Sequence, residues 1–279
     1  MTGPRSTYVT AAGFEVHVTE WGNPASPALI MWHGLARTGR DFDEAAKALS
    51  DSYFVLCPDT IGRGLSSWAR RPEVDYSYRS FGDTALGILD HYGIGRLRWI
   101  GTSMGGLIGV TLAAGRLRER ITHLVVNDIG PDIPEAGTGR IATYVGSPPI
   151  YETVAEMDAW LRRNYAPFGP NSDAFWQRMV DTSVRRTDAG KVTVHYDPAI
   201  VTQFTHHKAD LDVWDAYDAI TAPTLLLRGE TSDVLSVPVA AKMTQRGPKP
   251  RLVEFPGIGH APTLATEAEI DLLRQFLAG

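Results

Sequence analysis

A serine between two glycines stands where one apolar run gives way to another. Ser103 is the centre of Gly101-Thr102-Ser103-Met104-Gly105, which follows the apolar run 97–100 and precedes the apolar stretch 107–114. This pattern predicts a buried strand, a sharp turn and a helix. Side chains in place of the two glycines would collide with neighbouring backbone. The helix N-terminus would face the serine hydroxyl and favour developing negative charge, so Ser103 is a candidate nucleophile.

A serine hydroxyl needs a neighbouring base, and His260 is the candidate. It lies in Gly257-Ile258-Gly259-His260-Ala261-Pro262, directly after the apolar run 252–255. Glycines 257 and 259 let this loop fold back toward a neighbouring strand end. Histidine suits the role because its charge changes near neutral pH. We interpret the histidines outside such turns as surface or core residues: 17, 91, 123, 195, 206 and 207. Adjacent His206 and His207 do not indicate a metal site, because no other ligands accompany them.

Alternating strand and helix patterns organise the rest of the chain. Strands are predicted at 8–10, 14–20, 28–32, 53–57, 97–100, 121–126, 224–227 and 252–255, and helices at 41–49, 80–91, 238–245 and 267–277. This order predicts an α/β fold with a mostly parallel central sheet flanked by helices. Residues 132–215 break the rhythm and are rich in aromatic side chains. We expect a core formed by 1–131 and 216–279, with 132–215 as a helical cap insertion whose helices lie near 153–164 and 173–182.

Four further motifs follow predicted strands, at the sheet edge where open parallel sheets bind ligands. They are His33-Gly34-Leu35, the loop 59–66 (Asp-Thr-Ile-Gly-Arg-Gly-Leu-Ser), Gly229-Glu230-Thr231-Ser232-Asp233, and the loop that carries His260. Together with the Ser103 turn, and in the order serine, acid, histidine, these motifs resemble the α/β-hydrolase family over nearly the whole chain.

The resemblance implies a role for each position. Ser103 is the nucleophile, His260 the base and Asp233 the acid that orients the histidine. The alternative acid is Asp128, which ends the sixth strand and otherwise supports the hinge of the cap. The oxyanion of the tetrahedral intermediate is bound by the backbone N–H groups of Leu35 and Met104.

Three neighbouring groups are interpreted without a chemical role. His33 braces the loop that carries Leu35 rather than touching the substrate. The loop 59–66 is structural. Arg37 and Arg63 have the charge to bind an acidic substrate, but we interpret both as solvated or structural arginines.

The expected activity is hydrolysis of a small carboxylic ester through an acyl-enzyme, with no cofactor and no metal. Serine at 103 argues against haloalkane dehalogenases and epoxide hydrolases, which use aspartate there in this family. The segment after His33-Gly34 lacks the small-residue run typical of carbon–carbon bond hydrolases of ring-cleavage products. Those enzymes, lactonases and thioesterases remain alternatives. A small-ligand-binding relative is the non-enzymatic alternative, and retention of a complete triad speaks against it.

Composition excludes several partners. The net charge of −5 and the absence of a Lys/Arg block argue against nucleic acid and anionic membranes. Cys57 is the only cysteine, so an intrachain disulfide and a cysteine-based zinc site are excluded. The first ten residues lack a signal-peptide core and no apolar run reaches membrane-spanning length, so we expect a cytoplasmic protein. The sequence indicates neither the oligomeric state nor the natural substrate.

Overall fold

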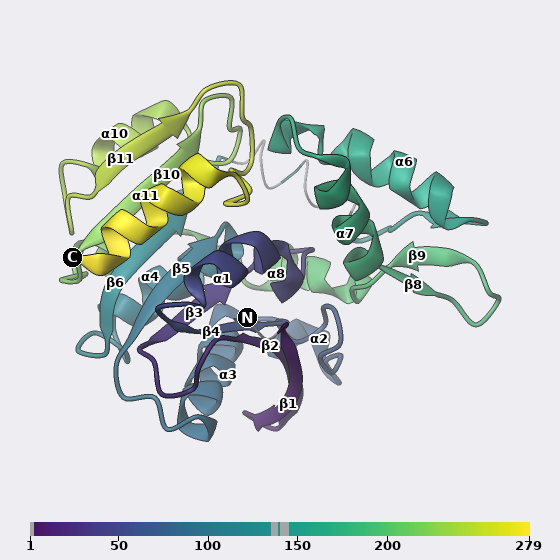
Figure 1. The fold of residues 1–279 in the computed structure, drawn as a ribbon, viewed down its shortest axis with the longest axis horizontal. Helices are drawn as coiled ribbons and strands as arrows, with labels where there is room; N and C mark the ends of the chain where they lie inside the picture. Colours follow the sequence, from purple (N-terminus) through teal and green to yellow (C-terminus); the bar gives the residue numbers. More distant parts are fainter. Residues whose placement is uncertain (1–2, 135–138, 140–144) are drawn as a thin grey trace.

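A central sheet forms the core of the computed structural model, which describes residues 3–134, 139 and 145–279. Within these residues, eight strands lie in the order β1-β2-β4-β3-β5-β6-β10-β11 (Figure 1). The strands are β1 Arg5–Ala11, β2 Phe14–Trp21, β3 Ala28–Trp32, β4 Phe54–Pro58, β5 Leu97–Thr102, β6 Ile121–Asn127, β10 Thr224–Gly229 and β11 Arg251–Phe255. β1 and β2 form an antiparallel hairpin, and β2 also pairs with β4 in the antiparallel direction. The remaining pairs are parallel. The expected α/β fold with a mostly parallel sheet is confirmed.

Helices cover both faces of the sheet because its central strands are apolar on both sides. The core helices are α1 Asp43–Leu49, α2 Pro72–Asp75, α3 Tyr78–His91, α4 Met104–Ala114, α10 Val237–Met243 and α11 Glu267–Ala278, with a 3₁₀ turn η1 at Gly39–Phe42. One apolar cluster joins α1 and α11 to the sheet, and a second, larger cluster joins α3, α4 and α10 to it. Among the described residues, no helix combines the length and apolar character needed to cross a bilayer.

The chain between β6 and β10 lies partly in a lobe beside the sheet, at the right of Figure 1. It contains helices α6 Val154–Asn164, α7 Asp173–Ser183, α8 Thr202–His206 and α9 Trp214–Asp218, the 3₁₀ turns η2 Ala166–Phe168, η3 Pro198–Val201 and η4 Lys208–Leu211, and a small antiparallel sheet of β7 Ile150–Tyr151, β9 Val192–Val194 and β8 Val184–Arg186. The two helices predicted from the sequence are present. The small sheet was not predicted, because strands of two or three residues are too short to show a period.

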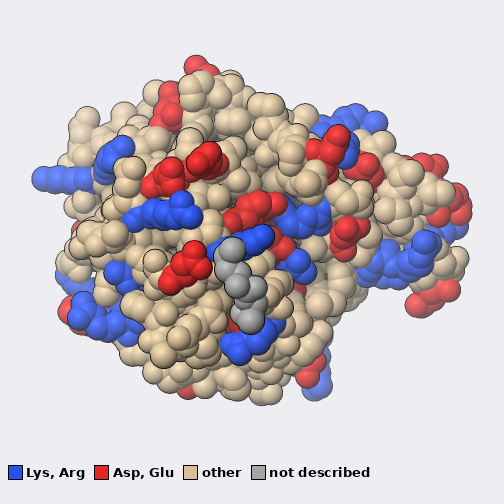
Figure 2. Space-filling view, viewed as in Figure 1, with Lys and Arg blue, Asp and Glu red and all other residues tan. Residues whose placement is uncertain are grey.

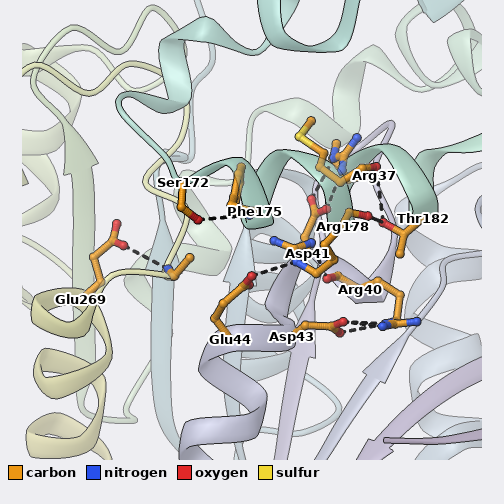
Figure 3. A network of polar contacts seen from close by, with 12 residues as sticks. Arg37, Arg40, Asp41, Asp43, Glu44, Ser172, Phe175, Arg178, Thr182 and Glu269 are labelled. Carbon is orange, nitrogen blue, oxygen red and sulfur yellow. Dashed lines mark hydrogen bonds and ion pairs between the residues drawn. The ribbon is translucent and has the colours of Figure 1, made fainter. Parts of the chain in front are cut away.

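Helix α7 is bound to the core by the polar network shown in Figure 3. Arg178 donates from Nε to Glu44 Oε1 (2.9 Å) and from Nη1 to the carbonyl of Arg40 (2.7 Å). Its guanidinium also lies over the Phe175 ring, 4.9 Å from the centroid. Asp132 and Asp212, near the two ends of the segment between β6 and β10, form an antiparallel bridge. The chain therefore leaves and re-enters the core at neighbouring points.

Charged side chains of both signs are interspersed on the face of the molecule shown in Figure 2. No large field of one sign covers that face. Such a mixed surface offers no extended electrostatic track for a polyanion.

Candidate active site

Ser103 occupies the turn between β5 and α4 with a backbone that L-residues rarely adopt. Its φ is 51° and its ψ is −117°. The turn is tight because backbone packs on backbone: a Cβ on Gly105 would lie 2.1 Å from the carbonyl oxygen of Trp32, and one on Gly101 would lie 2.2 Å from the carbonyl oxygen of Gly105. Only glycine fits at these two positions. The surrounding packing therefore holds Ser103 in a strained conformation at the start of a helix.

A chain of hydrogen bonds runs from Ser103 into the core. His260, in the loop after β11, places Nε2 2.9 Å from Ser103 Oγ. Its Nδ1 lies 2.8 Å from Oδ2 of Asp128, the residue that follows β6. A carboxylate accepts, so Nδ1 carries the proton and Nε2 presents a lone pair to the serine hydroxyl. This is the arrangement that general-base activation of a serine requires.

Asp128 is completely buried and its carboxylate is satisfied by fixed donors. Oδ1 accepts from the backbone N–H of Gly229 (2.9 Å), and Oδ2 accepts from the Ser232 hydroxyl (2.7 Å) as well as from His260. A buried carboxylate needs such compensation for its lost hydration. The donors also fix the orientation of the oxygen that faces the histidine.

The structure places the alternative acid, Asp128, against the histidine. His260 binds Asp128, the alternative, and Asp233 has an exposed side chain. The loop that carries Asp233 still serves the site, since it supplies Gly229 and Ser232 as donors to Asp128. Strands β6 and β10 are parallel neighbours, so both candidate acids follow adjacent strand ends. Strand order alone does not determine which of two such ends faces the histidine.

The two expected oxyanion donors lie beside Ser103. Met104 is the first residue of α4, and an N–H at that position has no acceptor within its own helix. The loop of Leu35 also lies against Ser103, since a Cβ on Gly34 would lie 3.7 Å from Ser103 Cβ. Within the described part of the chain, the N–H groups of Leu35 and Met104 donate to no backbone carbonyl in a turn or loop.

His33 braces the Leu35 loop from within the core. Its Nε2 accepts from the backbone N–H of Thr60 (2.9 Å), and its Nδ1 donates to the carbonyl of Gly34 (2.6 Å). Complete burial lowers the pKa of His33 to about 4, so the ring is neutral near neutral pH. A neutral ring is the form that can accept one of these hydrogen bonds and donate the other.

A pocket above Ser103 and His260 is enclosed partly by the segment between β6 and β10. That segment contributes aromatic and polar walls: Asn164, Tyr165, Pro167, Phe168 and Phe175. The core contributes one cation, Arg37, which donates from Nε and Nη2 to both oxygens of Asp41 (2.9 and 2.6 Å) and lies 4.9 Å from the centroid of Tyr165. The pocket is therefore largely apolar, with its one arginine already neutralised.

A second chain of the same side-chain types lies near the N-terminus. Ser6 Oγ is 2.6 Å from His17 Nε2, and His17 Nδ1 is 2.9 Å from Asp59 Oδ2. Ser6 sits in the regular strand β1, opposite Thr19 of β2, rather than at a strand-to-helix turn. Asp59 also accepts from the backbone N–H groups of Gly39 and Leu65. This chain ties the loop 59–66 to the hairpin, which agrees with the structural interpretation of that loop.

No cluster of metal ligands accompanies these groups. Among residues 3–134, 139 and 145–279, no three His, Cys, Asp or Glu side chains converge as a metal site would require. The chemistry that the site offers is that of its serine, imidazole and carboxylate.

Comparison with known proteins defines the class. Residues 27–264 match the model of the alpha/beta hydrolase fold family, and the chain belongs to that family. A 3-hydroxybutyrate-oligomer hydrolase from Cupriavidus necator is 36% identical over 270 residues, which are 93% of this chain and 92% of that protein. A 2-(acetamidomethylene)succinate hydrolase from Mesorhizobium japonicum is 26% identical, over 88% of this chain and 84% of that protein. The crystal structure of an alpha/beta hydrolase from Novosphingobium aromaticivorans superposes with a TM-score of 0.89 at 35% identity, over 100% of this chain and 99% of that one. The chain is a hydrolase of this family.

One pair of variants tests which of the two aspartates, Asp128 or Asp233, acts as the acid. We expect Asp128→Asn to lower kcat by about 10²–10⁴, because an amide neither fixes the tautomer of His260 nor stabilises its imidazolium form. Asp233→Asn should stay within about twofold of the unmodified protein, since exposed surface changes have small effects. Steady-state kinetics on one activated ester, with circular dichroism to verify folding, measures both. The reverse ranking would restore Asp233 as the acid.

His33 should make stability depend on pH. Its pKa is about 4 in the folded protein against 6.5 for a free side chain, so the unfolded chain binds more protons between these values. Stability therefore decreases as the pH falls from about 6.5 to about 4, by on the order of 3 kcal/mol from this residue. The free energy of unfolding, measured by urea denaturation at several pH values in this range, should change less with pH in His33→Asn than in the unmodified protein. His91→Asn, which alters an exposed histidine, should keep the full pH dependence of the free energy of unfolding. The same pH dependence in all three proteins would contradict the contribution of His33.

Proposed function

We propose that this protein is a serine hydrolase that cleaves small carboxylic esters through an acyl-enzyme. The observation that carries the proposal is the hydrogen-bonded chain from Ser103 through His260 to buried Asp128, at a strained strand-to-helix turn that opens into a pocket. A ligand-binding relative has no need for an activated serine at such a turn.

Acylation uses each group in turn. Ser103 Oγ forms a bond to the ester carbonyl carbon while its proton passes to His260 Nε2. Asp128 stabilises the resulting imidazolium, and the N–H groups of Leu35 and Met104 bind the carbonyl oxygen as it becomes negative. The bond to the leaving alcohol then breaks, and His260 returns the proton to the departing oxygen.

Deacylation repeats these steps with water. Water adds to the acyl carbon while His260 Nε2 takes its proton, and the same N–H groups bind the second oxyanion. The bond to Ser103 Oγ breaks, Oγ regains the proton from His260, and the carboxylic acid departs. The residues that start the reaction are thereby restored.

For the substrate, we propose esters of short hydroxy acids. The relative that is 36% identical over nearly the full length of both chains hydrolyses 3-hydroxybutyrate oligomers by its name, and such oligomers are chains of short aliphatic esters. The aromatic pocket walls suit a short aliphatic acyl group. The Arg37–Asp41 pair and Asn164 supply the polar groups that a free hydroxyl in the substrate needs.

We further propose that residues 132–215 act as a cap on the core formed by 1–131 and 216–279. Residues 135–138 and 140–144 of this segment lie outside the described residues. The support comes from Tyr165, Phe168 and Phe175, which line the pocket opposite Ser103. A cap of this kind shields the acyl-enzyme from bulk water and limits the size of the acyl group.

Replacing the nucleophile tests the chemistry. Ser103→Ala should fold normally and lose at least about three orders of magnitude in kcat on a p-nitrophenyl ester of a short acid, because the acyl-enzyme cannot form. A fluorophosphonate should label the unmodified protein at Ser103 and leave the variant unlabelled there. Turnover close to that of the unmodified protein in a clean preparation of the variant would eliminate Ser103 as the nucleophile.

Shortening one pocket wall tests the cap. Phe168→Ala should raise kcat/KM for longer acyl esters relative to acetate by on the order of tenfold, since a few methylenes of new space are worth that much. Tyr151→Ala is the matched control, because Tyr151 is a half-buried aromatic residue of the same segment outside the pocket. Chain-length profiles for p-nitrophenyl esters and melting temperatures measure both effects. An unchanged profile for Phe168→Ala with a large loss of melting temperature would make Phe168 a structural residue only.

A further inference from the structure

Arg63 lies behind the two residues whose N–H groups are proposed to bind the oxyanion. It belongs to the loop after β4, and its side chain is completely buried. Nε donates to the carbonyl oxygen of Leu35 at 2.8 Å, and Nη2 lies 3.6 Å from the sulfur of Met104. Nη1 donates to the carbonyl of Ile61 at 2.8 Å. One guanidinium thus contacts both Leu35 and Met104 from the side away from the pocket, which Arg63 does not line.

The charge of Arg63 has no carboxylate partner at ion-pair distance in the described part of the chain. Other buried arginines do: Arg37 is paired with Asp41, and Arg228 with Glu254. The rings of Tyr76 and Phe81 lie 5.4 and 5.3 Å from the Arg63 guanidinium carbon. The charge of Asp197 also acts on Arg63, but from beyond ion-pair distance, and the Asp197 carboxylate accepts a hydrogen bond from the Tyr76 hydroxyl at 2.6 Å.

A buried cation without an ion-pair partner is expensive, and an apolar side chain would fill the same space at lower cost. Burial lowers the pKa of Arg63 to about 10, which still leaves it charged near neutral pH. The aromatic faces and carbonyl oxygens stabilise the cation in part. A role in catalysis explains the remaining cost: the positive charge would stabilise the negative charge of the oxyanion, which exists only during the reaction.

We propose that Arg63 is a positioning residue for the oxyanion site and the source of a fixed positive field behind it. The inference rests on the proposed function. The hydrogen bond to Leu35 holds the loop of one donor, the contact with Met104 holds the residue of the other, and the charge lies behind both. Because the guanidinium is already in place before the carbonyl oxygen becomes negative, it stabilises the transition state without reorganisation.

Two variants separate charge from hydrogen bonding. Arg63→Gln keeps an N–H donor for the Leu35 carbonyl and removes the charge, whereas Arg63→Lys keeps the charge without the planar fork. The matched control is Arg98→Gln at the opposite end of β5, where Nε donates to the carbonyl of Leu277 (2.8 Å) and the guanidinium lies 4.9 Å from the Tyr53 centroid. Control and test therefore remove the same kinds of contact at different distances from Ser103.

The readouts are kcat and KM on a short p-nitrophenyl ester, and the pKa of the hemiketal hydroxyl that a ¹³C-labelled trifluoromethyl ketone forms on Ser103. We expect Arg63→Gln to lower kcat about tenfold to a hundredfold with KM within about threefold, and to raise the hemiketal pKa by about one unit or more. Arg63→Lys should retain most of the oxyanion stabilisation. Arg98→Gln should leave kcat and the hemiketal pKa unchanged even if it lowers the melting temperature.

Several outcomes would overturn the inference. An unchanged hemiketal pKa in folded Arg63→Gln would show that the charge of Arg63 does not stabilise the oxyanion. Equal losses in Arg63→Gln and Arg63→Lys would leave only a structural role. If Arg63→Gln does not fold, Arg63→Met provides a second neutral variant, and failure of both to fold would assign the residue to stability. Each of these results leaves the proposed function intact provided that Ser103→Ala is inactive and the ketone adduct forms on Ser103. An active Ser103→Ala would instead overturn the function itself.

Discussion

The contact of the Gly105 backbone with the carbonyl of Trp32 is the constraint on which the site depends. It brings the start of α4 against the end of β3, at a distance that admits no side chain. That approach forces Ser103 into its left-handed conformation and turns its hydroxyl out of the sheet. It also places the first N–H of α4 beside the loop after β3. The proposed nucleophile and the expected oxyanion donors are therefore positioned by one piece of backbone packing.

The molecule contains an internal comparison that shows what this packing adds. Ser6, His17 and Asp59 form the same hydrogen-bonded order as Ser103, His260 and Asp128, with similar distances. In β1, however, the neighbouring backbone groups are committed to the hairpin with β2. The serine–histidine–aspartate arrangement thus occurs twice. Of the two, only the one at Ser103 lies at a strained turn at the start of a helix. The backbone, more than the three side chains, distinguishes Ser103, the proposed nucleophile, from Ser6.

Much of the architecture was predictable from the sequence because long apolar runs with glycine-rich ends identify buried parallel strands. The strand ends at 33–35, 59–66 and 257–262 were therefore recognised together with the Ser103 turn. Which aspartate contacts His260 was not, since Asp128 and the 229–233 loop follow neighbouring strands. Gly229 and Ser232 were recognised as part of the 229–233 motif, but their role as donors to Asp128 was not, because it depends on tertiary contact. Arg63 was interpreted as a solvated or structural arginine, and only the structure shows that it is completely buried, with no carboxylate at ion-pair distance among the described residues.

The antiparallel bridge between Asp132 and Asp212 has a consequence for how such a protein diversifies. Pro131 also accepts a hydrogen bond from Val213 (2.9 Å), so the two ends of the inserted segment are held together where they join the sheet. A segment with adjacent ends can be lengthened, shortened or exchanged without moving the strands that flank it. The junction lies only a few residues beyond Asp128. On the proposed role of this segment as a cap, substrate preference can change by exchange of the segment while the proposed site stays the same, and the junction residues should tolerate far less variation than the segment between them.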